Sequence, residues 1–276
     1  MKSLVFGTAG IPLSTKPRHT EEGVRRVRAL GLDAMELEFV HSVNLSPEKA
    51  ALVKKAAQKE RVILTCHASY YINLNAREPE KKKASIGRIV NSARVLAAAG
   101  GWSACFHAGY YMKMPPKEVA ATIQEALEVV VDTCKEESLD VWIRPEIGGK
   151  TTSFGSLEEV LELSQSLDKV QPCIDWAHLY ARSLEKINSL GAYRDVLEKI
   201  EAALGKEALN NMHCHMEGIA LGKTGEKNHL PLKDSRFNYK AVLQAMKEFD
   251  CKGVVICESP TIEEDALILQ KAYLKK

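Results

Sequence analysis

Short apolar runs alternate with longer amphipathic runs along all 276 residues, and this alternation constrains the fold more than any other feature. The short runs fit β-strands and the longer ones carry helical periodicity, so each strand–helix pair takes roughly 30 to 40 residues. The predicted strands begin near Leu4, Ala34, Val62, Ala104, Val141, Gln171, Met212 and Val254. Eight such units predict a single (β/α)8 TIM barrel over residues 1–276, and an open, doubly wound α/β sheet is the alternative.

Local signals mark where several predicted helices begin. Ser46-Pro47-Glu48 combines a capping serine with a proline in the first turn. Capping boxes are predicted at Ser156-Leu157-Glu158-Glu159 and at Thr261-Ile262-Glu263-Glu264. Further helical periodicity runs through Glu78–Ala99, Pro116–Glu137 and Asn238–Phe249. The longest polar connections are expected on the face where the strands end, and they are Ala76–Lys83 and Gly218–Asp234.

Composition excludes several classes of protein. The formal net charge of +2 is too small to indicate nucleic-acid binding by itself, so any DNA-binding face must be local. The seven cysteines form no Cys-x-x-Cys pair, and most lie in apolar strand-like runs, which indicates buried thiols in a reducing compartment. No apolar run approaches the length of a membrane span. We therefore expect a cytoplasmic protein that uses no membrane and has no evident obligate protein partner.

Potential metal ligands occupy the ends of seven of the eight predicted strands. In a TIM barrel the active site lies at the carboxyl ends of the strands, so these side chains are expected to converge. In chain order they are Glu36 and Glu38, His67, His107, Glu146, Asp175 and His178, His213 and His215, and Glu258. His229 follows in the loop after the seventh predicted strand. Of the eight histidines, only His19 and His41 therefore lie away from the strand ends and this loop. Histidines and carboxylates together predict a divalent-metal site.

The segment from Met212 to Glu217 carries the densest part of this pattern. His213, His215 and Glu217 alternate with apolar residues and therefore share one face of a strand. Burying two imidazoles and a carboxylate together is costly unless something binds them. One core histidine and one exposed histidine would be the simpler interpretation. The pattern alone leaves open whether His213 or His215 is a metal ligand.

Several motifs resemble those of the endonuclease IV family. His67-Ala68-Ser69-Tyr70-Tyr71-Ile72-Asn73-Leu74 is similar to the family motif His-x-Ser-Tyr-x-Ile-Asn-Leu. Later family motifs are matched, in the family's order, by Phe106-His107-x-Gly109, Glu146 with the glycines after it, Asp175-x-x-His178 and Glu258-x-Pro260. The resemblance covers nearly the whole chain. It also places the chain near the wider group of xylose-isomerase-like barrels.

This resemblance implies an activity and a set of metal ligands. Endonuclease IV enzymes cut damaged double-stranded DNA on the 5′ side of abasic sites, using a trinuclear zinc cluster. For the first zinc the implied ligands are His67, His107 and Glu146, which also bridges to the second ion. For the second zinc they are Asp175, His215 and Glu258, and for the third they are His178 and His229. Tyr70 matches the tyrosine of the DNA-contacting loop.

Two departures from the family pattern suggest a divergent branch. Lys227 stands where the family has an aspartate ligand of the third zinc, and a lysine ammonium offers no lone pair to a cation. Either Glu226 or Glu217 substitutes, or the third ion is weakly bound or absent. Lys227 would then bind substrate by neutralising charge on the phosphate. Ile147 replaces the family asparagine that follows the glutamate of the fifth strand.

The residue types suit phosphodiester hydrolysis. Two metals about 4 Å apart clamp the attacking and leaving oxygens, and a metal-bound water ionises near neutral pH. We expect Glu146 to hold that spacing and Glu258 to orient or deprotonate the water. Zinc is the expected cofactor, as two or three ions, although manganese or iron(II) would also fit. DNA contacts are expected from local lysines and tyrosines, among them Lys81 to Lys83, Lys150, Tyr70 and Tyr110.

Two other functions fit part of the pattern. A sugar isomerase or epimerase on the same barrel would need one divalent metal, for which Glu146, Asp175, His215 and Glu258 suffice. It would leave the remaining histidines without a shared purpose. A non-catalytic protein that binds DNA lesions would keep the groove after losing a zinc. Metal count and cleavage of an abasic duplex distinguish the three functions.

Overall fold

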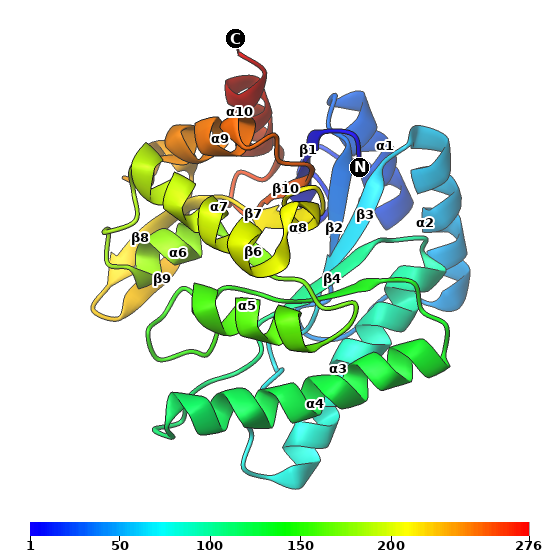
Figure 1. The fold of residues 1–276 in the computed structure, drawn as a ribbon. Coiled ribbons are helices and arrows are strands. Elements are labelled where there is room, and N and C mark those ends of the chain that lie inside the picture. The colour runs from blue at the N-terminus through cyan, green and yellow to red at the C-terminus, as the bar shows by residue number, and fades with distance from the viewer. Residues whose placement is uncertain (276) are drawn as a thin grey trace.

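The computed structural model describes residues 1–275, and eight parallel strands form a barrel enclosed by helices (Figure 1). The strands are β1 Leu4–Ala9, β2 Ala34–Glu38, β3 Ile63–His67, β4 Ser103–Phe106, β5 Trp142–Pro145, β6 Cys173–Asp175, β7 Met212–His215 and β10 Gly253–Cys257. Neighbouring strands follow the order β5-β4-β3-β2-β1-β10-β7-β6. Each strand begins within two residues of its predicted start, so the predicted (β/α)8 fold is confirmed.

Backbone contacts between β5 and β6 close the cylinder. Parallel bridges join Ile143 to Val170 and Glu146 to Cys173. The amide of Gln171 donates to the Ile143 carbonyl at 3.2 Å, and the amide of Ile147 donates to the Cys173 carbonyl at the same distance. These contacts leave the two end strands paired with each other, so the alternative of an open sheet is wrong.

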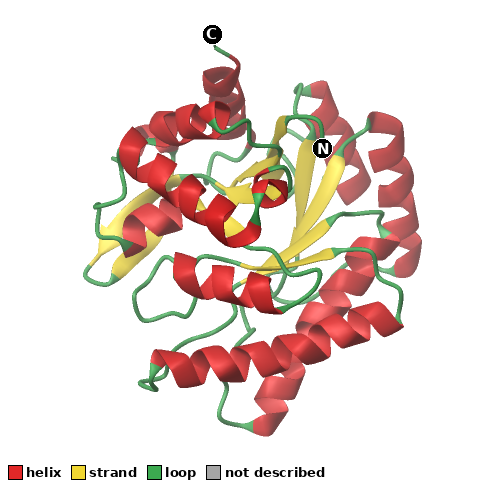
Figure 2. Ribbon diagram, viewed as in Figure 1, coloured by secondary structure: helices red, strands yellow, loops and turns green. Residues whose placement is uncertain are grey.

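Helices cover the outside of the barrel, as the red ribbons in Figure 2 show. They are α1 Thr20–Ala29, α2 Pro47–Glu60, α3 Pro79–Ala98, α4 Pro116–Glu136, α5 Leu157–Ser166, α6 Trp176–Arg182, α7 Leu190–Leu204, α8 Lys206–Leu209, α9 Tyr239–Glu248 and α10 Glu263–Leu274, with a short 3-10 turn at Leu232–Asp234. Within residues 1–275, no helix combines the length and the apolar character that crossing a membrane requires. All seven cysteines are buried free thiols, as predicted.

Two of the three predicted helix caps are confirmed. Ser46 accepts a hydrogen bond from the Lys49 amide, and Ser156 forms a complete capping box with Glu159. The box predicted at Thr261 is wrong, because Ile262 is the residue that precedes α10 and the helix has no side-chain cap. The Thr261 hydroxyl lies instead 3.0 Å from the Ser259 hydroxyl. Glu263 also has a different role, since its carboxylate accepts from the amides of Leu13 and Ser14, each at 2.8 Å.

The connection after β7 folds into a hairpin of β8 (Gly218–Gly222) and β9 (Gly225–Leu230), which the sequence pattern indicated only as a loop. The pairing slips between Ala220 and Leu221, because Ala220 faces Asn228 whereas Leu221 faces Glu226. The bulge leaves Lys227 as an additional residue on β9. Glu226 and His229 are three residues apart and would face opposite sides of a regular strand, and the bulge allows both to face the barrel.

The interior of the barrel is polar toward the carboxyl ends of the strands and has a small apolar cluster nearer their amino ends. Ala34, Val254 and Ile256 form a buried cluster separate from the main core, and they share strand faces with Glu36 and Glu258. Arg144 is also buried and donates to the carbonyls of Pro172 and Asn211, at 3.0 and 2.6 Å. Loss of hydration lowers the pKa of Arg144 to about 10. The charged side chains of such an interior require partners. The largest cluster of these side chains lies at the carboxyl ends of the strands.

Candidate metal centre

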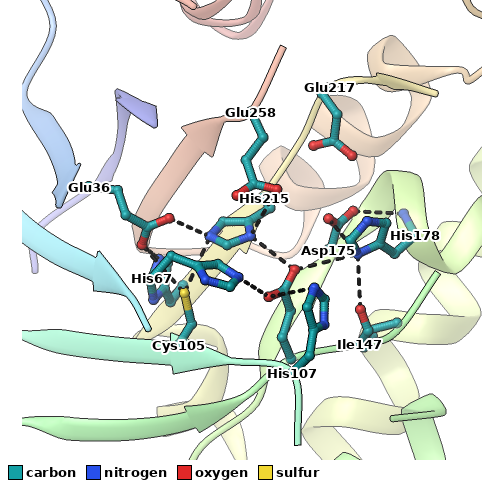
Figure 3. Close-up of polar contacts among 12 residues, drawn as sticks. Glu36, His67, Cys105, His107, Ile147, Asp175, His178, His215, Glu217 and Glu258 are labelled. Atoms are coloured by element: carbon teal, nitrogen blue, oxygen red, sulfur yellow. Dashed lines mark hydrogen bonds and ion pairs between the residues drawn. The ribbon is translucent and has the colours of Figure 1, made fainter. Parts of the chain in front are cut away.

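The predicted ligands converge at the carboxyl end of the barrel (Figure 3). Every strand from β3 to β7, and β10, delivers at least one of them at its last residue or shortly after it. A cavity of about 290 Å³ is lined by Glu258 and four of the histidines, His67, His107, His178 and His229, and its rim includes Tyr70, Tyr110 and Lys150. The residues brought together are His67, His107, Glu146, Asp175, His178, His215, His229 and Glu258.

Glu146 lies at the centre of the cluster and is fully buried. Its Oε2 is 3.0 Å from His67 Nε2 and 3.7 Å from His107 Nε2. Its Oε1 is 3.1 Å from His215 Nδ1 and 3.4 Å from His178 Nδ1. Burial opposes ionisation, but the charges of His107 and His215 outweigh it and hold the pKa of Glu146 well below its usual value. Each oxygen of this carboxylate faces a different set of ligands, so Glu146 is placed to bridge two cations.

A second set of ligand atoms adjoins the first. Single atoms of Glu146, Asp175, His215 and Glu258 all lie within 4.8 Å of one another. His215 Nδ1 is 3.6 Å from Glu258 Oε2, and Asp175 Oδ2 is 2.8 Å from His178 Nδ1. A cation among these three carboxylates would offset the repulsion between their charges in a buried setting.

Backbone contacts fix which nitrogen of His67 carries a proton. The Nδ1 atom of His67 is 2.7 Å from the carbonyl oxygen of Ala68, which can only accept a hydrogen bond. The Nε2 atom therefore meets Glu146 either as a lone pair with a metal between them or as a second protonated nitrogen. Burial opposes the charged ring, but the hydrogen bond and charge of Glu146 raise the pKa of His67 to about 10. A metal would replace that proton.

His178 and His229 form a third set. Their Nε2 atoms are 3.4 Å apart, while their Nδ1 atoms face the carbonyls of Ile147 and Glu258 at 3.1 and 3.2 Å. Each Nδ1 atom therefore has an acceptor to donate to, and the two Nε2 atoms face each other. Two nitrogens bound to one tetrahedral zinc are about 3.3 Å apart, so the observed spacing suits a shared ion.

Two glutamates adjoin this histidine pair, where Lys227 offers no ligand. Glu226 Oε2 is 3.5 Å from His178 Nε2, and Glu217 Oε1 is 4.0 Å from His229 Nε2. Glu217 is fully buried and neither of its oxygens has a hydrogen-bond partner. Burial, followed by the charge of Asp175, raises its pKa well above the usual value.

The glycines after Glu146 leave room for this third set. A Cβ on Gly149 would lie 2.6 Å from Glu226 Oε2 and 2.8 Å from the ring of His178. The donor set of imidazoles and carboxylates fits zinc, manganese or iron(II).

The structure separates His213 from His215. His215 reaches Glu146 and Glu258, whereas His213 lies one inward position deeper, beside Ser103 and Glu36. Neither histidine lines the cavity itself, but only His215 contacts carboxylates of the predicted ligand set. Glu36, which the strand-end pattern singled out without a role, contacts both histidines. Burial opposes its ionisation, but the charges of His215 and His213 hold its pKa well below the usual value.

The two predicted substrate-binding residues have different positions. Tyr70 lies at the cavity rim with 59% of its surface exposed, and its ring packs edge-on against His67 at 5.7 Å. Lys227 is exposed on the bulge of β9 and lies outside the cavity lining, because Glu226 takes the inward position. The lysine of the cavity rim is Lys150.

The remaining motif residues support the cavity wall. Ser69 donates to the Val40 carbonyl, and Asn75 donates to the Tyr110 carbonyl at 2.8 Å. Gly109 has a positive φ, and a Cβ there would lie 2.5 Å from Asn73 Oδ1. These contacts tie the loops after β2, β3 and β4 together. They hold His67 and His107 at neighbouring points of the rim.

A closed (β/α)8 barrel with a histidine–carboxylate cluster at the carboxyl ends of its strands defines a class of TIM-barrel proteins with candidate metal sites. Within that class, the chain belongs to the xylose isomerase-like TIM barrel family, which it matches over residues 24–276.

Similar proteins include members with different names. The uncharacterized protein MJ0133 of Methanocaldococcus jannaschii is 45% identical over 270 residues, covering 98% of this chain and 97% of that protein. A probable endonuclease 4 of Aster yellows witches'-broom phytoplasma is 23% identical, covering 76% of this chain and 79% of that protein.

Two solved structures share the fold. A D-tagatose 3-epimerase-like protein superposes with a TM-score of 0.74 at 17% identity, covering 97% of this chain and 94% of that one. Endonuclease IV from Thermus thermophilus superposes with a TM-score of 0.72 at 20% identity, covering 96% of this chain and 97% of that one. At these identities the likeness concerns the fold alone, so the distinction between nuclease and epimerase depends on the site.

Proposed function

We propose that this protein is a divalent-metal-dependent endonuclease that hydrolyses the phosphodiester on the 5′ side of abasic sites in double-stranded DNA. The observation that carries the proposal is the position of the histidines outside the quartet of Glu146, Asp175, His215 and Glu258. His67, His107, His178 and His229 all converge on the same cavity, and two of them face each other through Nε2 at 3.4 Å. A site for one metal would not need these four imidazoles.

The sequence comparisons agree with this choice without deciding it. The motif resemblance and the sequence match to a probable endonuclease 4 favour the nuclease, whereas the two structural neighbours share only the fold. The bound cations would supply Lewis-acid stabilisation of the negative charge that develops on the phosphate. Zinc fits the donor set, and manganese or iron(II) would also fit.

Three sets of side chains would hold the cations. His67, His107 and Glu146 would hold one ion, and Asp175, His215 and Glu258 a second. His178 and His229 would hold a third, together with Glu217 or Glu226. Glu146 is ionised and contacts both of the first two sets, so it would keep them at a fixed spacing.

Glu258 is the candidate general base. Its side chain is 12% exposed and lines the cavity, so a water molecule can reach it. The attacking water would form the new bond to phosphorus while its proton passes to Glu258. The bond from phosphorus to the leaving oxygen breaks in the same displacement, and that oxygen takes a proton from solvent. His67 and the other buried imidazoles would bind metal and not this proton.

The rim would contact DNA. Tyr70 and Tyr110 are 59% and 49% exposed beside the cavity, where aromatic rings can stack on bases next to a missing one. Lys150 lies on the same rim and would contact a phosphate. Lys227, on the exposed bulge, would contact the DNA backbone away from the reacting phosphate, so we no longer expect it to neutralise the reacting phosphate.

The test uses a labelled duplex with one abasic site, incubated with the zinc-loaded protein. We expect one incision 5′ to the site, abolished by chelator and by Glu146→Gln, and unchanged by Glu207→Gln on the exposed surface of α8. Retention of the duplex without incision, with zinc or manganese, would favour a lesion-binding protein and reject the endonuclease.

A sugar epimerase is the second candidate, because four ligand atoms of Glu146, Asp175, His215 and Glu258 lie within 4.8 Å and suffice for one metal. That function predicts one ion per chain and exchange of the α-proton of a ketose with solvent deuterium. Two or three ions per chain, with no such exchange, reject it.

A further inference from the structure

Two cysteines and a histidine meet in the barrel interior, apart from the cavity lining. Cys105 on β4, Cys173 on β6 and His213 on β7 have no exposed surface, and none of them lines the cavity. Single ligand atoms of these three residues and of His215 all lie within 4.8 Å of one another. Thiols and imidazoles are the usual ligands of closed structural zinc sites.

A buried carboxylate adjoins these ligands and brings their number to four. Glu36 on β2 is fully buried, and its Oε2 is 3.5 Å from Cys105 Sγ (Figure 3) and 3.0 Å from His213 Nε2. The same oxygen accepts a hydrogen bond of 2.7 Å from the Thr65 hydroxyl, which orients the carboxylate. Ligand atoms around one tetrahedral zinc are about 3.2–3.8 Å apart, so these spacings are close to those of a shared ion.

Two buried atoms of this cluster lack hydrogen-bond partners. His213 Nε2 is 3.0 Å from Glu36 Oε2, and Glu36 Oε1 is 2.9 Å from His215 Nε2, yet neither His213 Nε2 nor Glu36 Oε1 forms a hydrogen bond. Their distances suit hydrogen bonds, but their orientations do not. Such atoms need another partner, and a cation among the ligands would be one. The Ser103 hydroxyl, 3.0 Å from His213 Nδ1, offers that nitrogen an acceptor, so Nε2 can bind the ion.

The charges near the cluster also favour a divalent cation. Arg144 on β5 is buried and pairs in parallel register with Cys105. As thiolates, Cys105 and Cys173 add two negative charges to the charge of Glu36. A divalent cation and the guanidinium of Arg144 together neutralise these three charges, so the bound cluster carries no net charge into the barrel interior.

We propose that the barrel interior holds a second metal site, a closed structural zinc site formed by Cys105, Cys173, His213 and Glu36. Two metal–sulfur bonds form as the two thiol protons leave to solvent. The ion links β2, β4, β6 and β7 across the barrel. The site requires no particular proton position on His215, and it does not rest on the proposed function. Its ion is additional to the cavity ions, whose number distinguishes the nuclease from the epimerase.

Cobalt(II) tests this site, because thiolate-to-cobalt charge transfer absorbs in the near ultraviolet and the proposed cavity ligands contain no sulfur. The protein is produced in cobalt-supplemented medium, so that the ion enters as the chain folds. We expect the charge-transfer band in the wild-type protein, at least a twofold loss of the band in Cys173→Ser, and no loss in Cys134→Ser on the outer helix α4. Cys105 also lies near His67 and Glu146. A band unchanged in Cys173→Ser would therefore assign the sulfur to a cavity ion and overturn the inference.

Comparison of the band with DNA incision separates this inference from the proposed function. A chelator that abolishes incision should leave the band, since the cluster is closed to solvent, and loss of both together overturns the inference. Incision without a band also overturns it and keeps the proposed function, whereas a band without incision supports it and rejects that function.

X-ray absorption of the chelator-treated wild-type zinc protein decides the matter if Cys173→Ser does not fold. Retained zinc with sulfur neighbours at about 2.3 Å supports the site. No retained zinc, or zinc with nitrogen and oxygen neighbours alone, overturns it.

Discussion

Replacing Glu217 by glutamine should change stability in opposite directions with and without metal. The carboxylate is fully buried, and neither oxygen has a hydrogen-bond partner. An unpaired buried polar group costs about 1–3 kcal/mol, and more if it is charged. Glutamine is also an unpaired polar group but has no carboxyl to ionise, so in the metal-free protein at pH 8 Glu217→Gln should raise the free energy of unfolding by up to about 1.4 kcal/mol for each unit by which folding raises the pKa.

The sign of the effect follows from the pKa. Folding raises the pKa of Glu217 above 4.5, chiefly through burial and then through the charge of Asp175. The folded protein therefore holds this proton more tightly than the unfolded chain. That stabilisation is complete at acid pH and is lost as the pH rises above 4.5 toward the folded pKa. The advantage of glutamine should accordingly grow from pH 5 to pH 8.

With zinc bound, the same change should be unfavourable, because glutamine lacks the charge that would neutralise an ion between His178 and His229. The assay is urea unfolding at pH 5 and pH 8, with chelator and with zinc, using Glu207→Gln as the exposed control. A Glu217→Gln protein that is less stable than the wild type at pH 8 without metal would refute the reasoning about burial. Equal zinc affinity in the two proteins would show that Glu217 is not a ligand of the ion between His178 and His229.

Three further changes test other parts of the account. Gly253→Ala should cost at least about 3 kcal/mol of stability in thermal or urea unfolding, since a Cβ at this positive-φ glycine would lie 1.9 Å from the Met212 carbonyl oxygen. Gly191 has open space around it, so Gly191→Ala should not lower the stability. Equal losses of stability in the two variants would contradict the packing argument. Tyr70→Ala should weaken binding of an abasic duplex roughly 5- to 150-fold, because about 1–3 kcal/mol of stacking is lost. Tyr71 is outside the cavity lining, so Tyr71→Ala should leave binding unchanged. Similar losses of affinity in both variants would argue against stacking at the rim. Ser156→Ala should lower the free energy of unfolding by about 1 kcal/mol through loss of the α5 cap, and a neutral result would show that the cap contributes little.

The strands could be predicted because their apolar runs differ in length from the helical segments between them. The hairpin after β7 could not, since Gly218–Gly222 and Gly225–Leu230 carry little apolar alternation and are held by pairing with each other. The bulge at Lys227 has no sequence signal. It explains why alignment by motif placed a lysine at a ligand position while the structure turns Glu226 inward.

The ligands could be predicted from their positions at strand ends, but their depth in the barrel could not. His213 and His215 share a strand face, and alternation cannot distinguish them. The register does, because His215 pairs with Asp175 and Ile256 whereas His213 pairs with Cys173 and Val254 one layer below. The same register brings Glu36 beneath His215. Thr261 illustrates the reverse case, because a good capping pattern failed where the Thr261 hydroxyl contacts Ser259 and the helix begins after Ile262.

The most direct test of the metal centre is an anomalous difference map from crystals of the zinc-loaded protein, measured at the zinc absorption edge. The account predicts two or three peaks, two of them flanking the carboxylate of Glu146, and one between His178 and His229 if the third ion binds. Ligand distances should be about 2.0–2.2 Å to nitrogen and oxygen. No peak within reach of Glu146, or peaks only at other surface histidines, would contradict it.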